Sequence, residues 1–332
     1  MKNRNWRRSI ANVVLCAGAF GFGALCVELS GLEPPPALQR SLSPLVVSAP
    51  PVVPEPEPEA LTLPDPDWSD GAIVTGGTPH RLIHFTFDDG PDRRTTPVLL
   101  NELDRLGIKA TFFVTTGRMA SLGARARTER ALLQEIVRRG HRLGNHTVSH
   151  QQLPLLTPQE VRNEIQSASD LIAEVTGIDT PLVRPPGGSR SPRIDAALAS
   201  MGYTQVLWNI GSGDFQVRSA DEVVDTFTRV LARRERENGE RGGIVLMHDT
   251  HPWSVAALPR IVDRLKSRNC ELLAEGEELF DIVDDPDLFY ASSGDDPSAL
   301  AGPAEPPSEY LAQRQRTLRE QTARRCAAVA QN

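Results

Sequence analysis

The chain has 332 residues, of which 39% are hydrophobic and 24% are charged, so it can hold one sizeable globular domain or two small ones plus some unpacked sequence. This composition excludes a largely disordered protein. The formal net charge of -7 provides no general basic surface for neutralising phosphates, so no nucleic acid is expected as a partner.

Residues 1–31 have the pattern of a signal peptide or membrane anchor. Basic side chains up to Arg8 precede an uncharged, mostly apolar stretch over residues 9–27. Its length is near the lower limit for crossing a bilayer, so a cleaved signal peptide and a retained anchor both stay open. We expect an exported protein that is periplasmic, secreted or anchored to the outer face of the cytoplasmic membrane, with membrane contact only through this segment.

Two other regions differ in composition from the centre of the chain. Residues 32–79 form a Pro/Glu-rich linker, because closely spaced prolines sustain neither a helix nor a central strand. Residues 286–332 form a low-complexity tail, in which residues 309–330 have the pattern of a basic helix. Outside the N-terminal segment the cysteines are Cys270 and Cys326, which either pair in an oxidising compartment or remain free thiols.

The centre of the chain alternates short runs of apolar, β-branched residues with longer amphipathic runs. We predict strands over residues 82–87, 110–115, 142–145, 182–184, 205–209 and 243–247. We predict helices over residues 95–106, 129–139, 158–176, 192–201, 220–236 and 255–268. This alternation predicts an α/β fold with a parallel sheet that helices close or partly close. In barrels of this kind, chemistry gathers at the C-terminal ends of the strands.

Two runs place candidate metal ligands near such strand ends. The run TFDDGP ends a predicted strand in the adjacent carboxylates of Asp88 and Asp89. Two anions so close need a cation nearby, although an Asp-Gly turn facing solvent is the alternative. The run HTVSH spaces His146 and His150 four residues apart, so that their rings face the same way if the backbone is helical. With Asp89 they make a two-histidine, one-carboxylate set for a zinc-like ion.

Three further runs follow predicted strands. RPPGG begins at Arg184, where prolines fix the backbone and glycines permit close approach by a ligand. WNIGSGDF contains one acid, Asp214, and taken alone these two runs are also those of ordinary loops. IVLMHD presents His248 at the end of an apolar strand, and a histidine with its ordinary pKa of about 6.5 delivers a proton near neutral pH. We interpret the neighbouring Asp249 and His251 as solvated loop residues, with a catalytic role for either as the alternative.

In this order, the five runs resemble the motifs of NodB-type polysaccharide deacetylases, the fourth carbohydrate esterase family, over residues 84–280. The resemblance implies a distorted (β/α) barrel of the polysaccharide deacetylase type, with residues 80–285 as the catalytic domain of a metal-dependent hydrolase. It implies one divalent metal, with Zn²⁺ preferred and Co²⁺ or Ni²⁺ as alternatives, held by Asp89, His146 and His150. The other implied roles are catalytic base for Asp88, orientation of that base by Arg184, general acid for His248, orientation of that acid by Asp214, and oxyanion binding by the backbone N–H of Gly187.

Three positions depart from the family pattern. Many family members have an aromatic residue where Gly187 stands, an Asp where Gly211 stands and a Trp where Phe215 stands. The metal set is untouched, and Gly187 keeps its N–H, but a ring that contacts sugar is lost. The changes at Gly211 and Phe215 bear on the role of Asp214 and on the shape of the substrate groove.

The expected reaction is hydrolysis of N-acetyl groups on an envelope or extracellular polysaccharide, such as peptidoglycan or a chitin-like GlcNAc polymer, with release of acetate. The expected partner is therefore an N-acetylated polysaccharide, and no feature of the sequence indicates an oligomeric state. The alternatives are an O-acetyl esterase acting on xylan-type polymers and a non-catalytic glycan-binding module with this fold. Retention of both Asp88 and His248 favours an enzyme, since a binding module requires neither.

Overall fold

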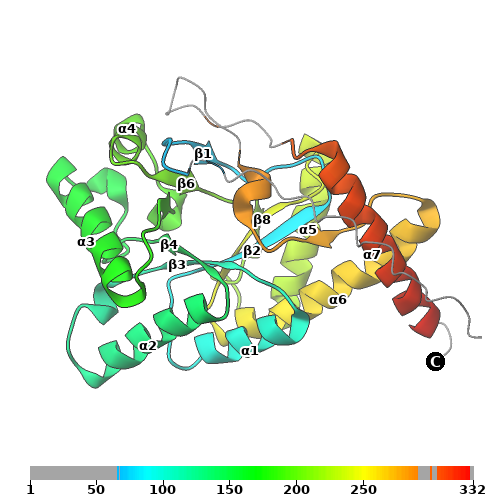
Figure 1. The fold of residues 1–332 in the computed structure, drawn as a ribbon, viewed down its shortest axis with the longest axis horizontal. Helices are drawn as coiled ribbons and strands as arrows, with labels where there is room; N and C mark the ends of the chain where they lie inside the picture. Colours follow the sequence, from blue (N-terminus) through cyan, green and yellow to red (C-terminus); the bar gives the residue numbers. More distant parts are fainter. Residues whose placement is uncertain (1–65, 67, 291–299, 301–304, 330–332) are drawn as a thin grey trace, which may run out of the picture. The chain divides into compact units, whose positions relative to one another are not determined.

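A computed structural model describes residues 66, 68–290, 300 and 305–329 of the chain (Figure 1). The predicted signal or anchor over residues 1–31, and most of the predicted linker, lie outside the described residues. Within the part that is described, no helix is both long and apolar enough to cross a membrane.

A parallel sheet forms the centre of the fold. Its strand order in the described residues is β1-β6-β5-β4-β3-β2-β8-β7, and β9 pairs with the start of β2. The strands are β1 (Ile73–Val74), β2 (Leu82–Asp88), β3 (Thr111–Val114), β4 (Arg142–Asn145), β5 (Leu182–Val183), β6 (Thr204–Val206), β7 (Ile210–Gly211), β8 (Gly243–His248) and β9 (Asp281–Ile282). The pairing runs from β1 to β7 without closing on itself among these strands, so the predicted distorted (β/α) barrel is confirmed as an open, half-closed one.

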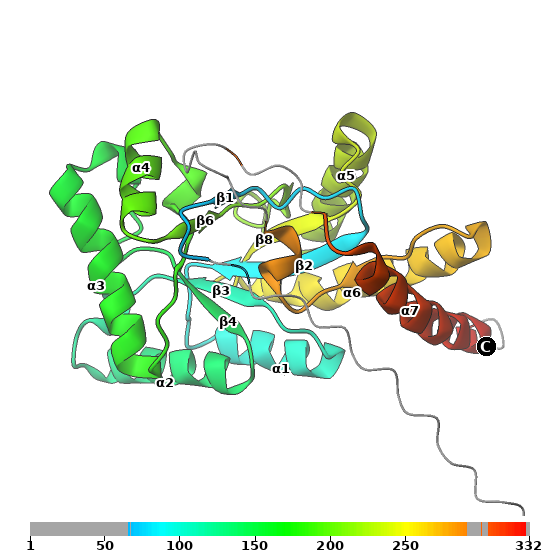
Figure 2. The same ribbon diagram turned by 45° about the horizontal axis from the view of Figure 1, so that its top comes forward.

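Helices surround the sheet (Figure 1, Figure 2). They are α1 (Thr96–Leu106), α2 (Ala124–Arg138), α3 (Pro158–Thr176), α4 (Pro192–Ser200), α5 (Ala220–Asn238), α6 (Pro252–Glu275) and α7 (Ser308–Val329). Short 3₁₀ turns add η1 (Gly117–Met119), η2 (Leu153–Leu155), η3 (Pro186–Gly188) and η4 (Pro286–Phe289). Helix α3 shows why the ends are where they are: Thr157 and Glu160 form a capping box, and Gly177 ends the helix in the left-handed conformation.

The single strand predicted over residues 205–209 is wrong, because the chain forms β6 and β7 with a break between them. At the break, side chains replace the ladder of backbone hydrogen bonds. Arg184 donates from Nε to the carbonyl of Val206 at 2.8 Å and from Nη2 to that of Leu207 at 3.1 Å. Strands β1 and β9 were not predicted, and β1 lies within the segment interpreted as a linker.

The side chains on the two faces of β2 pack into two different hydrophobic cores. Ile83, Phe85 and Phe87 pack with residues of α1, α5 and α6 in the layer between sheet and helices. Leu82 faces the inside of the barrel, where it packs with side chains of the other strands and of η4. Because side chains alternate along a strand, Asp88 follows Leu82 on the inner face. The alternation therefore sends a carboxylate into the barrel at the C-terminal end of β2.

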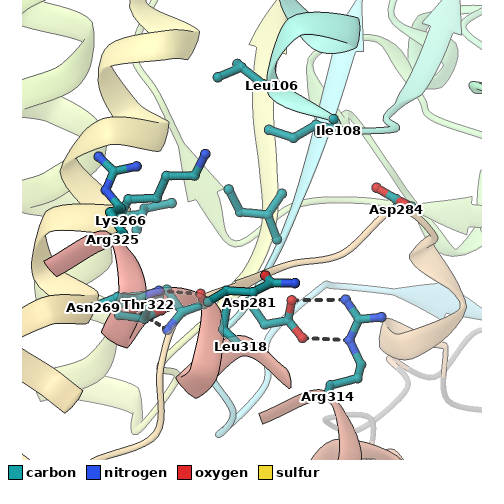
Figure 3. Close-up of a pocket in the computed structure, with 15 residues that line it drawn as sticks. Leu106, Ile108, Lys266, Asn269, Asp281, Asp284, Arg314, Leu318, Thr322 and Arg325 are labelled. Carbon is teal, nitrogen blue, oxygen red and sulfur yellow. Dashed lines mark hydrogen bonds and ion pairs between the residues drawn. The ribbon is translucent and has the colours of Figure 1, made fainter. Parts of the chain in front are cut away.

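Helix α7 is bonded to β9, which lies beside the start of β2, at the end of that strand opposite to Asp88. Arg314 pairs with Asp281 of β9 through two hydrogen bonds of 2.6 and 3.0 Å (Figure 3). The side-chain amide of Gln315 bonds both the N–H and the carbonyl of Leu279 at 2.9 Å. Between α6, α7 and β9 remains a cavity of about 480 Å³. Of the two possibilities left open by the sequence for Cys270 and Cys326, the structure has the disulfide, which joins α6 to α7.

Removing this cross-link should lower the stability of the protein. The Cys326→Ser variant is expected to lose about 2–4 kcal/mol of unfolding free energy, because a disulfide that closes a long loop restricts the unfolded chain. Denaturant unfolding of parent and variant measures the loss. The double variant Cys270→Ser/Cys326→Ser should match the single one, and a parent whose unfolding midpoint is the same with and without reductant would contradict the expectation.

Candidate active site

The candidate residues lie at the rim formed by the C-terminal ends of the parallel strands. In the register between β2 and β8, Asp88 is paired with His248. In the register between β4 and β5, Asn145 is paired with Val183, so His146 and Arg184 leave the sheet side by side. Parallel pairing thus gathers at one rim side chains that are far apart in the sequence.

Asp89, His146 and His150 come together at this rim. The Oδ1 atom of Asp89 lies 3.6 Å from Nε2 of His146 and 3.2 Å from Nε2 of His150. One potential ligand atom from each residue lies within 4.8 Å of the other two. His146 is buried, Asp89 is partly buried and His150 is exposed, so the group opens to solvent on the His150 side.

Two atoms that face each other in this group, Oδ1 of Asp89 and Nε2 of His146, are both acceptors. Nδ1 of His146 donates to the carbonyl of Arg184 at 2.6 Å, so Nε2 presents a lone pair toward Asp89. Burial lowers the pKa of His146 although the nearby carboxylates of Asp88 and Asp89 oppose it, which favours the neutral ring. Oδ1 of Asp89 is buried and makes no hydrogen bond among the described residues. Two imidazole nitrogens and one carboxylate oxygen in this arrangement are suitable ligands for a divalent ion such as Zn²⁺, Co²⁺ or Ni²⁺.

The backbone around these side chains is strained. Asp89, Thr147 and His150 have φ values of 76°, 69° and 60°, in the left-handed region that residues other than glycine rarely occupy. Each such residue costs about 1–3 kcal/mol and persists only where its surroundings hold it. Strain of this kind concentrates at functional sites, and here two of the three residues are candidate ligands.

The segment from His146 to His150 is a loop, so the helical backbone on which the sequence argument relied is wrong. Its rings face each other because side chains hold the loop. Oδ1 of Asn145 accepts the N–H of Thr147 at 2.7 Å, and Oγ1 of Thr147 accepts the N–H of His150 at 3.0 Å. Glu164 of α3 accepts two more N–H groups of the loop, at 3.0 and 2.8 Å. Nothing in the local sequence indicates Glu164, since it belongs to the following helix.

Arg184 holds the Asp88 carboxylate inside the barrel. Its side chain is fully buried, and Nη1 donates to Oδ1 of Asp88 and to Oγ1 of Thr86, each at 2.7 Å. The guanidinium lies over the ring of Phe113, with Cζ 4.0 Å from the ring centroid. The other carboxylate oxygen of Asp88, Oδ2, lies 3.6 Å from Nε2 of His146. One oxygen of Asp88 is therefore fixed by Arg184, and the other faces the candidate metal ligands.

His248, which is partly buried, and Asp214, which is buried, form a pair on the other side of the group. Oδ1 of Asp214 accepts from Nδ1 of His248 at 2.8 Å, and Oδ2 accepts from its backbone N–H at 2.7 Å. Burial favours the neutral form of His248, but the hydrogen bond and charge of Asp214, together with Asp88 and Asp89, raise its pKa to about 9. Burial likewise opposes ionisation of Asp214, and His248 outweighs it, so the pKa of Asp214 is lowered. The free Nε2 of His248 lies 4.0 Å from Oδ2 of Asp89.

Known proteins show the same combination of fold and motifs. Residues 75–206 match the family model described as polysaccharide deacetylase. A peptidoglycan-N-acetylglucosamine deacetylase of Bacillus cereus is 33% identical over 207 residues, which are 61% of this chain and 72% of that protein. The chain belongs to the polysaccharide deacetylase family.

Two further deacetylases show how far the similarity extends. The peptidoglycan-N-acetylglucosamine deacetylase PgdA of Listeria monocytogenes is 32% identical over 198 residues, which are 60% of this chain but 39% of that protein. The chain thus spans about two fifths of the length of that relative. A solved peptidoglycan N-acetylglucosamine deacetylase, in complex with 4-naphthalen-1-yl-N-oxidanyl-benzamide, superposes with a TM-score of 0.54 and 26% identity, covering 66% of this chain and 92% of the other.

The positions that depart from the polysaccharide deacetylase pattern lie around the same rim. Gly187 has a φ of 62° on the turn after β5, and a Cβ built there would meet nothing nearer than Oγ of Ser189 at 3.9 Å. A Cβ on Gly211 would lie 3.8 Å from Nε1 of Trp208. The side chain of Phe215 is 53% exposed, with its ring 6.1 Å from that of His248. The rim of the sheet is therefore open at both glycines and carries an exposed ring beside His248.

The interpretation of Asp249 as a solvated loop residue is wrong, because its side chain is fully buried. Oδ2 accepts from Oγ1 of Thr96 at 2.5 Å, and burial raises the pKa of Asp249 to about 7. A Cβ on Gly90 would collide with both carboxylate oxygens, so the turn after Asp89 packs directly on Asp249. His251 is half-buried, and its ring stacks on that of His248 with centroids 5.5 Å apart. No pattern in the local sequence distinguishes Asp249 and His251 from residues exposed to solvent.

The pair of Asp214 and His248 predicts a titration that can be measured. In metal-free Asp214→Asn protein, the pKa of His248 should fall from about 9 to its ordinary value of about 6.5 or lower, since the partner charge is lost and burial remains. NMR titration of the imidazole measures this shift.

The raised pKa of His248 also makes the stability of the folded protein depend on pH. Because the folded-state pKa of His248 is raised, its charged form stabilises the parent fully below pH about 6.5, and this contribution is lost as the pH rises through about 9. The stability difference between parent and Asp214→Asn should follow the same course. An unchanged His248 pKa in the variant would contradict the assignment.

Proposed function

We propose that the chain removes N-acetyl groups from an envelope or extracellular polysaccharide, peptidoglycan or a chitin-like GlcNAc polymer, and releases acetate. The observation that carries the proposal is the juxtaposition at one rim of a fixed carboxylate, Asp88, and a charged imidazole, His248, with the group of Asp89, His146 and His150. The names of the related proteins support N-acetylglucosamine in a polymer as the substrate.

Amide hydrolysis sets two demands on such a site. A water molecule must be made nucleophilic, and a strongly basic nitrogen must be protonated as it leaves. Held by Asp89, His146 and His150, a divalent ion, for which we propose Zn²⁺, supplies Lewis-acid polarisation of the acetyl carbonyl and lowers the pKa of water. The protein's own groups move the protons.

Asp88 is the proposed base. Arg184 fixes Oδ1 through a 2.7 Å hydrogen bond, which leaves Oδ2 free to accept a proton from the attacking water. His248 is the proposed acid, because Asp214 keeps its imidazole charged up to a pH of about 9 and its Nε2 faces the group. The N–H of Gly187, on the open turn after β5, is proposed to bind the oxygen on which negative charge develops.

We propose that the protein works outside the cytoplasm. The signal or anchor pattern of residues 1–31 supports export, and so does the disulfide between Cys270 and Cys326, because disulfides persist in oxidising compartments. The relatives named for peptidoglycan support the same location, since that polymer lies outside the cytoplasmic membrane.

Acetate release from purified polymers tests the proposed reaction. The protein is incubated with peptidoglycan, a GlcNAc polymer and acetylated xylan, first as purified, then after chelation, and then after Zn²⁺, Co²⁺ or Ni²⁺ is restored. We expect acetate and free amine from an N-acetylated polymer, loss of both on chelation, and recovery with metal. Release from xylan alone, or release that survives chelation, would contradict the proposal.

The Asp88→Asn variant tests the role of Asp88 as the base independently of metal binding. It keeps an oxygen for Arg184 but no longer accepts a proton, so turnover should fall by about 10²- to 10⁴-fold. Its metal content after loading should stay at the parent level, measured by elemental analysis. Full activity in Asp88→Asn would exclude this residue as the base, and an inactive parent that still binds glycan would favour a binding module.

A further inference from the structure

The segment from Thr115 to Arg118 lies between the two loops that carry the candidate ligands. On one side, the N–H of Thr116 donates to the carbonyl of Thr147 at 3.1 Å, and that of Gly117 donates to the carbonyl of Val148 at 2.8 Å. A Cβ on Gly117 would lie 2.6 Å from the Val148 carbonyl oxygen, so only glycine permits this approach. The segment is thus bonded to the loop of His146 and His150.

On its other side, the segment holds the turn that contains Asp89. The N–H of Thr115 donates to the carbonyl of Gly90 at 3.1 Å, and its Oγ1 donates to the carbonyl of Asp89 at 2.9 Å. Arg118 adds the charged donor. Its Nη2 donates to the Asp89 carbonyl at 2.6 Å and also lies 3.3 Å from the carbonyl oxygen of Pro91.

A buried carboxylate lies next to the guanidinium of Arg118. Glu129 of α2 is 1% exposed, and its Oε1 lies 3.7 Å from Nε of Arg118. The same oxygen accepts from Nε of Arg125 at 2.8 Å. Arg118 and Arg125 therefore share one partner, but of these two arginines it is Arg118 that donates hydrogen bonds to the Asp89 turn.

We propose that Arg118 is a positioning residue that aims the Asp89 carboxylate at the two histidines. Asp89 has a φ of 76°, a conformation that an aspartate leaves readily unless its carbonyl is held. Rotation about the N–Cα bond moves the carbonyl group and Cβ of a residue together, so donors that hold the Asp89 carbonyl oxygen oppose a relaxation of φ that would carry the side chain away from the histidines. This inference rests on the proposed metal site, and it assigns a role to a residue whose hydrogen bonds go to the backbone of the Asp89 turn.

Metal binding by the apo protein tests the proposal without any measurement of turnover. Full-length parent, Arg118→Met and Arg125→Ala are stripped of metal and titrated with Co²⁺, with the visible absorption bands recorded. Arg118→Met keeps the apolar stem and removes every donor. Its Kd for Co²⁺ should rise about 10- to 100-fold, the usual effect of losing a group that orients a ligand, and its bands should change in position or intensity.

Arg125→Ala is the matched control, because it removes the other arginine on Glu129 and leaves the Asp89 turn untouched. Its Kd and spectrum should stay at the parent values. A Kd for Arg118→Met equal to that of the parent, or an equal weakening in Arg125→Ala, would overturn the inference. If Arg118→Met does not fold by circular dichroism, Arg118→Gln, too short to span both carbonyls, is judged by the same criterion.

One comparison separates the inference from the function on which it rests. The parent and Asp89→Asn are titrated with Co²⁺ in parallel. If the parent binds no better than Asp89→Asn, the proposed metal site is wrong and the role of Arg118 fails with it. If the parent binds far more tightly and Arg118→Met matches it, the metal site stands and only the role of Arg118 is lost.

Discussion

The pairing of β2 with β8 is the constraint on which the site depends. Six consecutive residue pairs, from Ile83 with Gly243 to Asp88 with His248, fix the register of the two strands. Both strands are buried on both faces, so a slip by one residue would turn every inner side chain toward the helices. The same register that buries the aromatic residues of β2 therefore sets a carboxylate beside an imidazole at the rim.

Charges inside the barrel are tolerated because each is compensated locally. Arg184 has no exposed surface, yet every donor group of its guanidinium meets an oxygen or a ring, and Asp88 balances its charge. Asp214 and His248 form a second compensated pair. Removing one partner of such a pair would leave an isolated buried charge, which costs far more than the pair contributes. The Asp89 group is different, since a buried carboxylate oxygen without a hydrogen bond among the described residues faces two imidazoles, an arrangement that a divalent cation would compensate.

Much of this arrangement could be predicted from local sequence. The long strands and the six helices of the central region follow from hydrophobic period and glycine ends, and the candidate residues lie at the C-terminal ends of strands or in the loops that follow them. The predictions that were wrong concern segments whose conformation depends on contacts with residues distant in the sequence. The break at residues 207–209 exists because Arg184 takes the freed carbonyls, and the loop of His146 and His150 is held by Glu164 from the next helix. Asp249 is buried by the turn of Gly90 from another strand. Two-residue strands such as β1 and β9 carry too little pattern to be recognised.

Helix α7 is attached far from the candidate residues. The helix is bonded to β9, which lies beside the start of β2, whereas the candidate residues lie beyond the end of that strand. Helix α7 thus lies at the end of β2 opposite to that of the candidate residues. If the proposed function holds, a long polymer bound at the rim would therefore not contact α7, and the C-terminal helix would bear on the stability of the fold and not on access to the site.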